Sequence, residues 1–149
     1  SQPSDKAERQ TSYLEALAML PRLTISYGKF LSVSRQCPHC RQKIDSQSEQ
    51  MTDVNIAVEL LGDAYQDRYD MALLISGDSD LVPPVTMVRR LFPRKRIVVA
   101  FPPKRHSVDL ANAAAAYFTI GRKVIADSQL PDTMTIAEGF AVTRPERWR

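Results

Sequence analysis

Two short apolar runs, Met71–Ile75 and Ile97–Phe101, restrict the possible folds more than any other part of this sequence. Each is far too short to cross a bilayer and has the length of a strand buried on both faces. Between them, residues 81–92 carry apolar side chains at helical spacing. Strand, helix and strand in this order are typical of a parallel sheet with right-handed crossovers. We therefore expect an α/β fold in which Met71–Ile75 is a central strand.

The rest of the chain predicts further elements around this sheet. A helix is expected over residues 5–20, a strand from 23 towards 31, a polar loop over 35–50, and a second helix that Thr52 caps. A helix over 108–117, a short strand at 119–120 and a helical turn at 122–127 complete the pattern. We expect one domain over residues 1–131, followed by an extended tail over 132–149.

Composition fits a globular chain with a basic surface. The 149 residues are 44% hydrophobic and 25% charged, and the two cysteines are too few for a disulfide framework. No charged-then-apolar leader opens the sequence, so we expect a cytoplasmic protein that does not enter a membrane. The net charge is only +3, but basic clusters surround an acidic centre. That distribution suits a polyanionic substrate, although a merely solvated charged face gives the same pattern.

The acidic centre follows the first apolar run as Ser76-Gly77-Asp78-Ser79-Asp80. Ligands of open α/β sheets bind at the carboxyl ends of the strands, where Gly77 permits a tight turn. Asp78 and Asp80 are close enough in sequence to converge on one Mg²⁺ or Mn²⁺ ion. The alternative is that one of them only caps the next helix. Asp53, at the start of the second helix, is by itself explained by the helix dipole.

Taken together, these residues resemble the NYN domain of the PIN-like nuclease superfamily. The resemblance rests on Thr52-Asp53-Val54-Asn55-Ile56-Ala57 followed by Ser76-Gly77-Asp78-Ser79-Asp80, in this order and separated by a helix and a strand. It implies a PIN-like α/β/α sandwich, a central, mainly parallel sheet and metal-dependent cleavage of RNA. It also implies that Asp53, Asp78 and Asp80 are catalytic Mg²⁺ or Mn²⁺ ligands, with Asn55 and Ser79 at the substrate.

One family feature has no counterpart in this sequence. Family members open with a strand that carries an Asp, followed shortly by an Asn, and that acid completes the pocket. No such stretch precedes the helix at residues 5–20, and Asp5 does not lie in an apolar strand. We therefore expect a fold without its usual first strand, and a non-catalytic module that binds RNA or a partner is the alternative to a nuclease.

Cys37-Pro38-His39-Cys40 is a C-x-x-C pair of the kind found in zinc ribbons. Structural zinc needs four ligands, and the whole sequence has two cysteines and two histidines. Free thiols, a zinc knuckle formed by Cys37 and Cys40, and a redox pair all stay open. A zinc site shared across a homodimer is one form of the second alternative.

A basic loop follows the second apolar run. Lys104, Arg105 and Ser107 precede the helix expected from residue 108, on the carboxyl side of the sheet, where they can hold phosphate groups. A solvated loop explains them equally well, and His106 is a candidate proton shuttle.

From the resemblance and the residues that carry it, we expect a metal-dependent endoribonuclease acting on single-stranded or structured RNA. A small phosphohydrolase is a third alternative, although its aspartyl nucleophile would be expected after the first strand of the fold.

Overall fold

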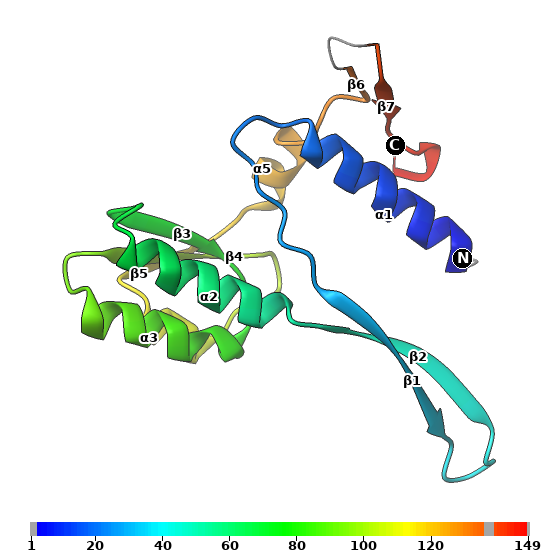
Figure 1. Cartoon of the computed structure of the whole chain (residues 1–149), viewed down its shortest axis with the longest axis horizontal. Helices are drawn as coiled ribbons and strands as arrows, with labels where there is room; N and C mark the ends of the chain where they lie inside the picture. Colours follow the sequence, from blue (N-terminus) through cyan, green and yellow to red (C-terminus); the bar gives the residue numbers. More distant parts are fainter. Residues whose placement is uncertain (1–2, 136–138, 149) are drawn as a thin grey trace. The chain divides into compact units, whose positions relative to one another are not determined.

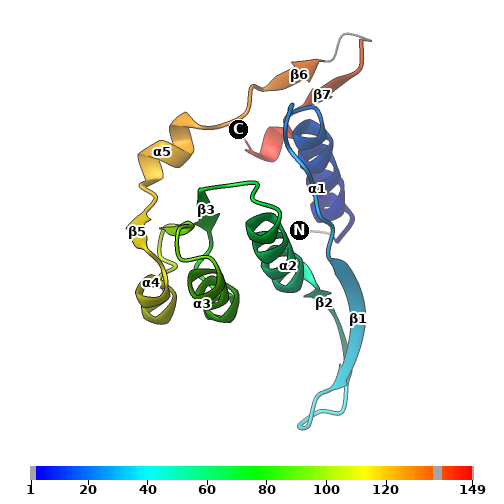
Figure 2. The same ribbon diagram turned by 60° about the vertical axis from the view of Figure 1, so that its left-hand side comes forward.

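A computed structural model describes the backbone of residues 3–135 and 139–148, and the side chains of these residues outside 3–7, 44–47 and 147. The chain divides into two compact units, a sheet unit of residues 26–125 and a terminal unit of residues 1–25 and 126–149. Figure 1 labels most of the helices and strands, and Figure 2 also labels α4. In chain order the elements, including two short 3₁₀ turns (η), are α1 (Pro3–Ala18), β1 (Lys29–Gln36), β2 (Lys43–Gln50), α2 (Thr52–Tyr65), β3 (Met71–Ile75), η1 (Ser79–Leu81), α3 (Val82–Leu91), β4 (Arg96–Phe101), α4 (Val108–Ala113), β5 (Ala116–Thr119), α5 (Arg122–Asp127), β6 (Thr133–Thr135), β7 (Ala141–Thr143) and η2 (Glu146–Trp148).

The sheet unit is built on a parallel three-stranded sheet in the order β3-β4-β5. Met71 lies opposite Arg96 and Ile75 opposite Ala100, so β3 and β4 end together. Helices α2, α3 and α4 lie along one side of the sheet (Figure 2). Their inward side chains form one core with the strands, which includes Leu74, Leu81, Val85, Val88, Ile97, Val99, Phe101 and Leu110. The α/β fold with a parallel sheet, expected from the sequence, is confirmed.

Strand β3 lies at the edge of this sheet, and β4 is in the middle. Leu74 points into the core, whereas Met71, Leu73 and Ile75 are each more than half exposed. The prediction of a central strand buried on both faces is therefore wrong for β3 and right for β4. An uninterrupted apolar run cannot distinguish a strand buried on two faces from an edge strand with one exposed apolar face.

The segment expected as a polar loop forms a β-hairpin instead. Strands β1 and β2 pair antiparallel over their full length, with Lys29 opposite Gln50 and Gln36 opposite Lys43. The strand predicted from residue 23 begins only at Lys29. Almost every described side chain of this ribbon is exposed. A strand without a buried face needs no alternation of apolar and polar residues, and that alternation is what marks a half-buried strand in a sequence.

The alanine-rich helix is shorter than expected. Helix α4 ends at Ala113, because Ala114 takes an extended conformation and the backbone N–H of Ala115 donates to the carbonyl of Ile97 at 2.8 Å. The chain then forms β5 along β4, with Ala116 opposite Val98. Alanine favours a helix locally, but pairing with the sheet decides the conformation of this segment.

The terminal unit combines α1 with the predicted tail. Strands β6 and β7 form a short antiparallel hairpin, and the rings of Tyr13 and Trp148 meet edge to face at 6.1 Å. An ion pair of 3.3 Å joins Arg144 to Asp132. The domain boundary at residue 131 stays a prediction. Across residues 3–135 and 139–148, none of the helices has the length and apolar character that crossing a membrane requires.

Candidate functional site

The loop that follows β3 carries two of the three predicted acids. The Asp78 carboxylate accepts a hydrogen bond from the backbone N–H of Asp80 at 3.0 Å, and the N–H of Asp78 donates to the Ser76 hydroxyl at 3.1 Å. Asp78 therefore caps η1, as one of the two acids was expected to do. Asp78, Ser79 and Asp80 are all exposed, so their side chains are accessible to a ligand.

Asp53 lies in the first turn of α2, close to the same loop. Partial desolvation raises the pKa of the Asp53 carboxyl, and the negative charges of Asp78, Asp80 and Glu49 raise it further. The side chain is nevertheless exposed, so the desolvation is local. The structure thus brings the three predicted acids of two separate motifs into one negative cluster, which we call the acidic edge (Asp53, Asp78 and Asp80).

Glu49, at the end of β2, is a fourth acid that the sequence did not single out. The Thr52 backbone N–H donates to its carboxylate at 3.2 Å, and the Thr52 hydroxyl bonds to the same oxygen. Thr52 therefore does not cap α2 as predicted; Met51 occupies that position with a φ of 78°. Glu49, Asp53 and Asp80 line a hollow of about 380 Å³. Glu49 is only four residues before Asp53 in the chain, so the short connection between β2 and α2 keeps its carboxylate beside the first turn of the helix.

The acidic edge has the donor chemistry of a divalent-cation site, since carboxylate oxygens are the ligands that Mg²⁺ and Mn²⁺ prefer. No described Lys or Arg forms an ion pair with any of its three carboxylates. Among the described side chains, however, no three Cys, His, Asp or Glu groups are close enough together to hold a metal ion. The aspartates are neighbours with like charges, and their role as metal ligands stays a prediction.

The basic loop after β4 contacts the acidic loop directly. A Cβ atom added at Gly77 would lie 2.8 Å from Cβ of Arg105 and 3.2 Å from its carbonyl carbon and oxygen. Gly77 does not have a positive φ, so this close approach, not a tight turn, requires a glycine there. The contact places the backbone of Arg105 beside the loop that carries Asp78 and Asp80.

The other residues of the basic loop have different local roles. Lys104 takes a left-handed conformation with a φ of 62°, and Ser107 caps α4 by accepting from the Leu110 N–H at 3.2 Å. Lys104 and Arg105 are exposed, so both can reach a phosphate group. The ring of His106 lies 4.3 Å from that of Phe101, between centroids. Phosphate binding by Lys104, Arg105 and Ser107 stays a prediction.

Asn55 lies two residues beyond Asp53, the first acid of α2, and is half-buried. Its side-chain amide donates to the carbonyl of Tyr27 at 3.1 Å, which ties the start of α2 to the segment that precedes β1. This bond gives Asn55 a structural role close to Asp53. Its predicted contact with substrate is untested.

The Cys37–Cys40 pair lies in the turn of the β1–β2 hairpin, at the opposite end of β2 from Glu49. The backbone N–H groups of Cys40 and His39, together with the Cys40 thiol, hydrogen-bond to the Cys37 sulfur and lower its pKa. Both cysteines are free thiols, so no disulfide joins them. The pair is thus separated along the hairpin from the acidic edge.

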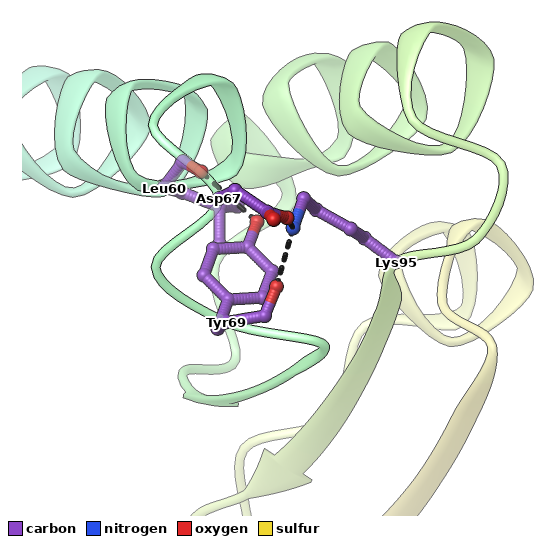
Figure 3. Close-up of polar contacts among 4 residues, drawn as sticks. All are labelled: Leu60, Asp67, Tyr69 and Lys95. Atoms are coloured by element: carbon purple, nitrogen blue, oxygen red, sulfur yellow. Dashed lines mark hydrogen bonds and ion pairs between the residues drawn. The ribbon is translucent and has the colours of Figure 1, made fainter.

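An ion pair around a buried lysine lies at the other end of the sheet, before the strands begin. The Lys95 ammonium is 2.6 Å from both the Asp67 carboxylate and the Tyr69 carbonyl, and it lies 5.2 Å from the centre of the Tyr69 ring (Figure 3). The Tyr69 hydroxyl donates to the Leu60 carbonyl at 3.0 Å. The side chain of Lys95 is 8% exposed and that of Asp67 is 87% exposed. We call Asp67, Tyr69 and Lys95 the lysine cluster. The hydrogen bond from Lys95 and its positive charge lower the pKa of the Asp67 carboxyl.

Comparison with known proteins places the chain in a family. No curated protein matches it. A solved structure of a protein of unknown function from Vibrio parahaemolyticus is similar, with 18% identity and a TM-score of 0.49. That match covers 82% of this chain and 65% of the other chain. The family model of the NYN domain matches residues 7–122, which include every residue of the acidic edge and of the basic loop. The chain therefore belongs to the NYN domain family of the PIN-like superfamily.

Proposed function

We propose that this protein is a metal-dependent endoribonuclease that hydrolyses RNA phosphodiester bonds at the acidic edge. The observation that carries the proposal is that Asp53, Asp78 and Asp80, from two separate motifs, form one exposed negative cluster where β3 ends. A parallel sheet presents ligand sites at this end of its strands. The NYN family membership supports nuclease chemistry at this position.

Mg²⁺ is usually bound through one or two carboxylates and keeps several waters, so Asp53, Asp78 and Asp80 would hold one or two Mg²⁺ or Mn²⁺ ions without all three surrounding a single ion. When bound, such an ion supplies a polarised water and neutralises charge on the phosphate. The aspartates also repel a bare phosphate, so their charge favours substrate only after cations are bound. Hydrolysis adds water across a P–O bond, so one RNA end keeps the phosphate and the other gains a hydroxyl.

The basic loop would orient the RNA at this edge. Lys104 and Arg105 are exposed on the segment that contacts Gly77. Cations on this segment can bind the phosphates that flank the cleaved bond, and such contacts weaken as salt rises. They fix the position of the backbone without reading the base sequence. We expect single-stranded or structured RNA as the substrate and a cytoplasmic place of action.

The decisive experiment is an RNA cleavage assay with end-labelled RNA and Mn²⁺. The variant carries Asp78→Asn and Asp80→Asn, and the matched control carries Asp67→Asn, the same chemical change at the other end of the sheet. Loss of a residue that only supports a metal ligand costs about 10–100-fold in activity, so we expect loss of two direct ligands to lower the cleavage rate by at least about 100-fold. The control should keep the wild-type rate.

Two results would contradict the proposal. One is cleavage that survives in the double variant, which would place the reaction elsewhere. The other is no cleavage by the wild-type chain with Mn²⁺ or Mg²⁺, combined with RNA binding that weakens steeply with salt. That second result would favour a non-catalytic RNA-binding module, the alternative that the open arrangement of the three aspartates also fits.

A further inference from the structure

The turn of the β1–β2 hairpin carries both cysteines on a hydrogen-bonded backbone. The Cys37 N–H donates to the Gln42 carbonyl, and the Arg41 N–H donates to the Cys37 carbonyl, each at 2.9 Å. The Gln36 side-chain amide adds a bond of 3.0 Å to the carbonyl of Arg41, and Arg41 has a φ of 56°. These bonds fix the backbone of the turn, and neither sulfur takes part in them.

The surroundings of the two sulfurs suit metal ligands. Backbone N–H groups of Cys40 and His39 hydrogen-bond to the sulfur of Cys37, and the Cys40 thiol lies 4.0 Å from the side-chain oxygen of Gln42 at the end of the same turn. Such donors around a ligand atom orient it and stabilise its bound state. Cys37 is half-buried and Cys40 is exposed, so neither thiol is needed to fill a core. Paired thiolates in a C-x-x-C turn suit Zn²⁺, which forms tetrahedral sites with sulfur ligands.

A complete zinc site needs two more ligands than the turn provides. The sequence has no further cysteine, and its histidines are His39 and His106. His39 lies between the cysteines, and the ring of His106 stacks beside Phe101 and Tyr117 on the sheet. Within the described part of the chain, no third Cys, His, Asp or Glu joins the pair to make a ligand set. A ligand pair of the same kind is available on a second copy.

We propose that Cys37 and Cys40 form half of a four-thiolate zinc site, which the same two residues of a second copy of the chain complete. The hairpin makes this geometry accessible. Its eight-residue strands place the turn roughly 25 Å from the start of α2, at about 3.4 Å per residue. Two turns can therefore meet at one metal ion while the acidic edges stay apart.

The charges of the turn fit the proposed site. Arg35, Arg41 and Lys43 flank the cysteines and are exposed. Zn²⁺ with four thiolates carries a net charge of −2, which nearby cations stabilise. Without zinc, two such turns repel each other because each is basic. Association through this surface should therefore require the metal.

The experiment measures mass and metal content of the purified, reduced chain. Light scattering after size exclusion should show a dimer with Zn²⁺ and a monomer after chelation, with one zinc per two chains. Titration with Co²⁺ should give the visible spectrum of tetrahedral four-thiolate cobalt, complete at half an equivalent per chain. Cys37→Ser and Cys40→Ser should each abolish zinc uptake and the dimer. His39→Ala, the matched control in the same turn, should retain both.

Each contrary result overturns the proposal. No zinc uptake by the reduced chain would leave the cysteines as free thiols. One zinc per monomeric chain would show that the remaining ligands do not come from a second copy. A zinc-dependent dimer that survives both cysteine substitutions would place the metal elsewhere. Far-UV circular dichroism of the variants distinguishes loss of the site from unfolding, and RNA cleavage is not the readout, so the test is independent of the proposed function.

Discussion

The two ends of the β3-β4-β5 sheet shift the pKa of an aspartate in opposite directions. At the lysine cluster, Asp67 lies 2.6 Å from the ammonium of Lys95, which lowers the pKa of the carboxyl. At the acidic edge, partial desolvation and the charges of Asp78, Asp80 and Glu49 raise the pKa of Asp53. The negative charge of an aspartate is thus paired with a cation at one end of the strands, and at the other end it lies among further negative charges.

This difference separates a structural role from a binding role. A paired carboxylate adds to the stability of the folded chain, whereas neighbouring carboxylates without a cation reduce it. Uncompensated charge in a folded protein is typical of sites that bind a ligand of opposite charge. Substitutions at the lysine cluster should therefore change stability and leave cleavage intact, and substitutions at the acidic edge should do the reverse.

The largest effect on stability is expected from Lys95→Met. Methionine retains the apolar part of the buried side chain but leaves the Tyr69 carbonyl without its 2.6 Å hydrogen bond from the ammonium. Loss of one partner of a part-buried hydrogen bond costs about 1–3 kcal/mol. Urea unfolding should show this decrease in the free energy of unfolding, with RNA cleavage unchanged below the transition. Arg94→Met, an exposed neighbour, is the control, and equal stability of the two variants would refute a structural role for the lysine cluster.

Gly77→Ala should have the next largest effect, at the opposite end of the sheet. The new methyl group would lie 2.8 Å from Cβ of Arg105, so the acidic and basic loops must separate. Overpacking of this kind costs about 1–3 kcal/mol, and exposed loops relax towards the lower end of that range. Cleavage should also fall, because the cations of the basic loop move away from Asp78 and Asp80.

The control for this change is Gly121→Ala, since a Cβ at Gly121 meets no atom within 4 Å. Thermal unfolding and cleavage rates of both variants check the expectation. If Gly77→Ala is as stable and active as Gly121→Ala, the contact between the two loops does not position the site.

The sequence predicted the strands of the sheet better than the elements at its margins. The apolar runs predict β3 and β4 because both contribute core residues, but they do not reveal that β4, not β3, is central. Strand β2 carries no apolar face, so its residues read as a loop. The end of α4 depends on a backbone bond between Ala115 and Ile97, which are far apart in sequence. Local patterns cannot express such long-range pairing.

The residues of the candidate site could likewise be predicted only in part. Asp53, Asp78 and Asp80 lie in recognisable motifs next to predicted elements, and the structure brings them together. Glu49 lies only four residues before Asp53, so its proximity could be read from the sequence, but no motif in this polar segment marks it as part of the site. The sequence indicates a tight turn at Gly77, but the glycine is required because Arg105 approaches it closely, in a contact between two loops that local patterns do not reveal.

A smaller effect is expected from the pH dependence of Asp67. Its pKa is lower in the folded chain, so the pair with Lys95 contributes stability that is fully present above the unfolded pKa of the carboxyl. That contribution is lost as the pH falls through the lower, folded pKa. The difference in unfolding free energy between wild type and Asp67→Asn should therefore shrink in strong acid. A difference that stays constant with pH would mean that the charge of Asp67 contributes nothing.

The smallest effect, and opposite in sign, is expected from Asp53→Asn. The pKa of Asp53 is raised, so its ionised form destabilises the folded chain above the folded pKa, and this cost vanishes below the unfolded pKa. Without metal at neutral pH, the variant should be more stable than wild type by less than about 1 kcal/mol, because the side chain is exposed and screened. Added Mn²⁺ should reverse the order, since bound cations stabilise the carboxylate cluster and the variant has lost one ligand. Thermal unfolding with and without Mn²⁺ measures both differences, and a wild type that Mn²⁺ does not stabilise would argue against a cation site at the acidic edge.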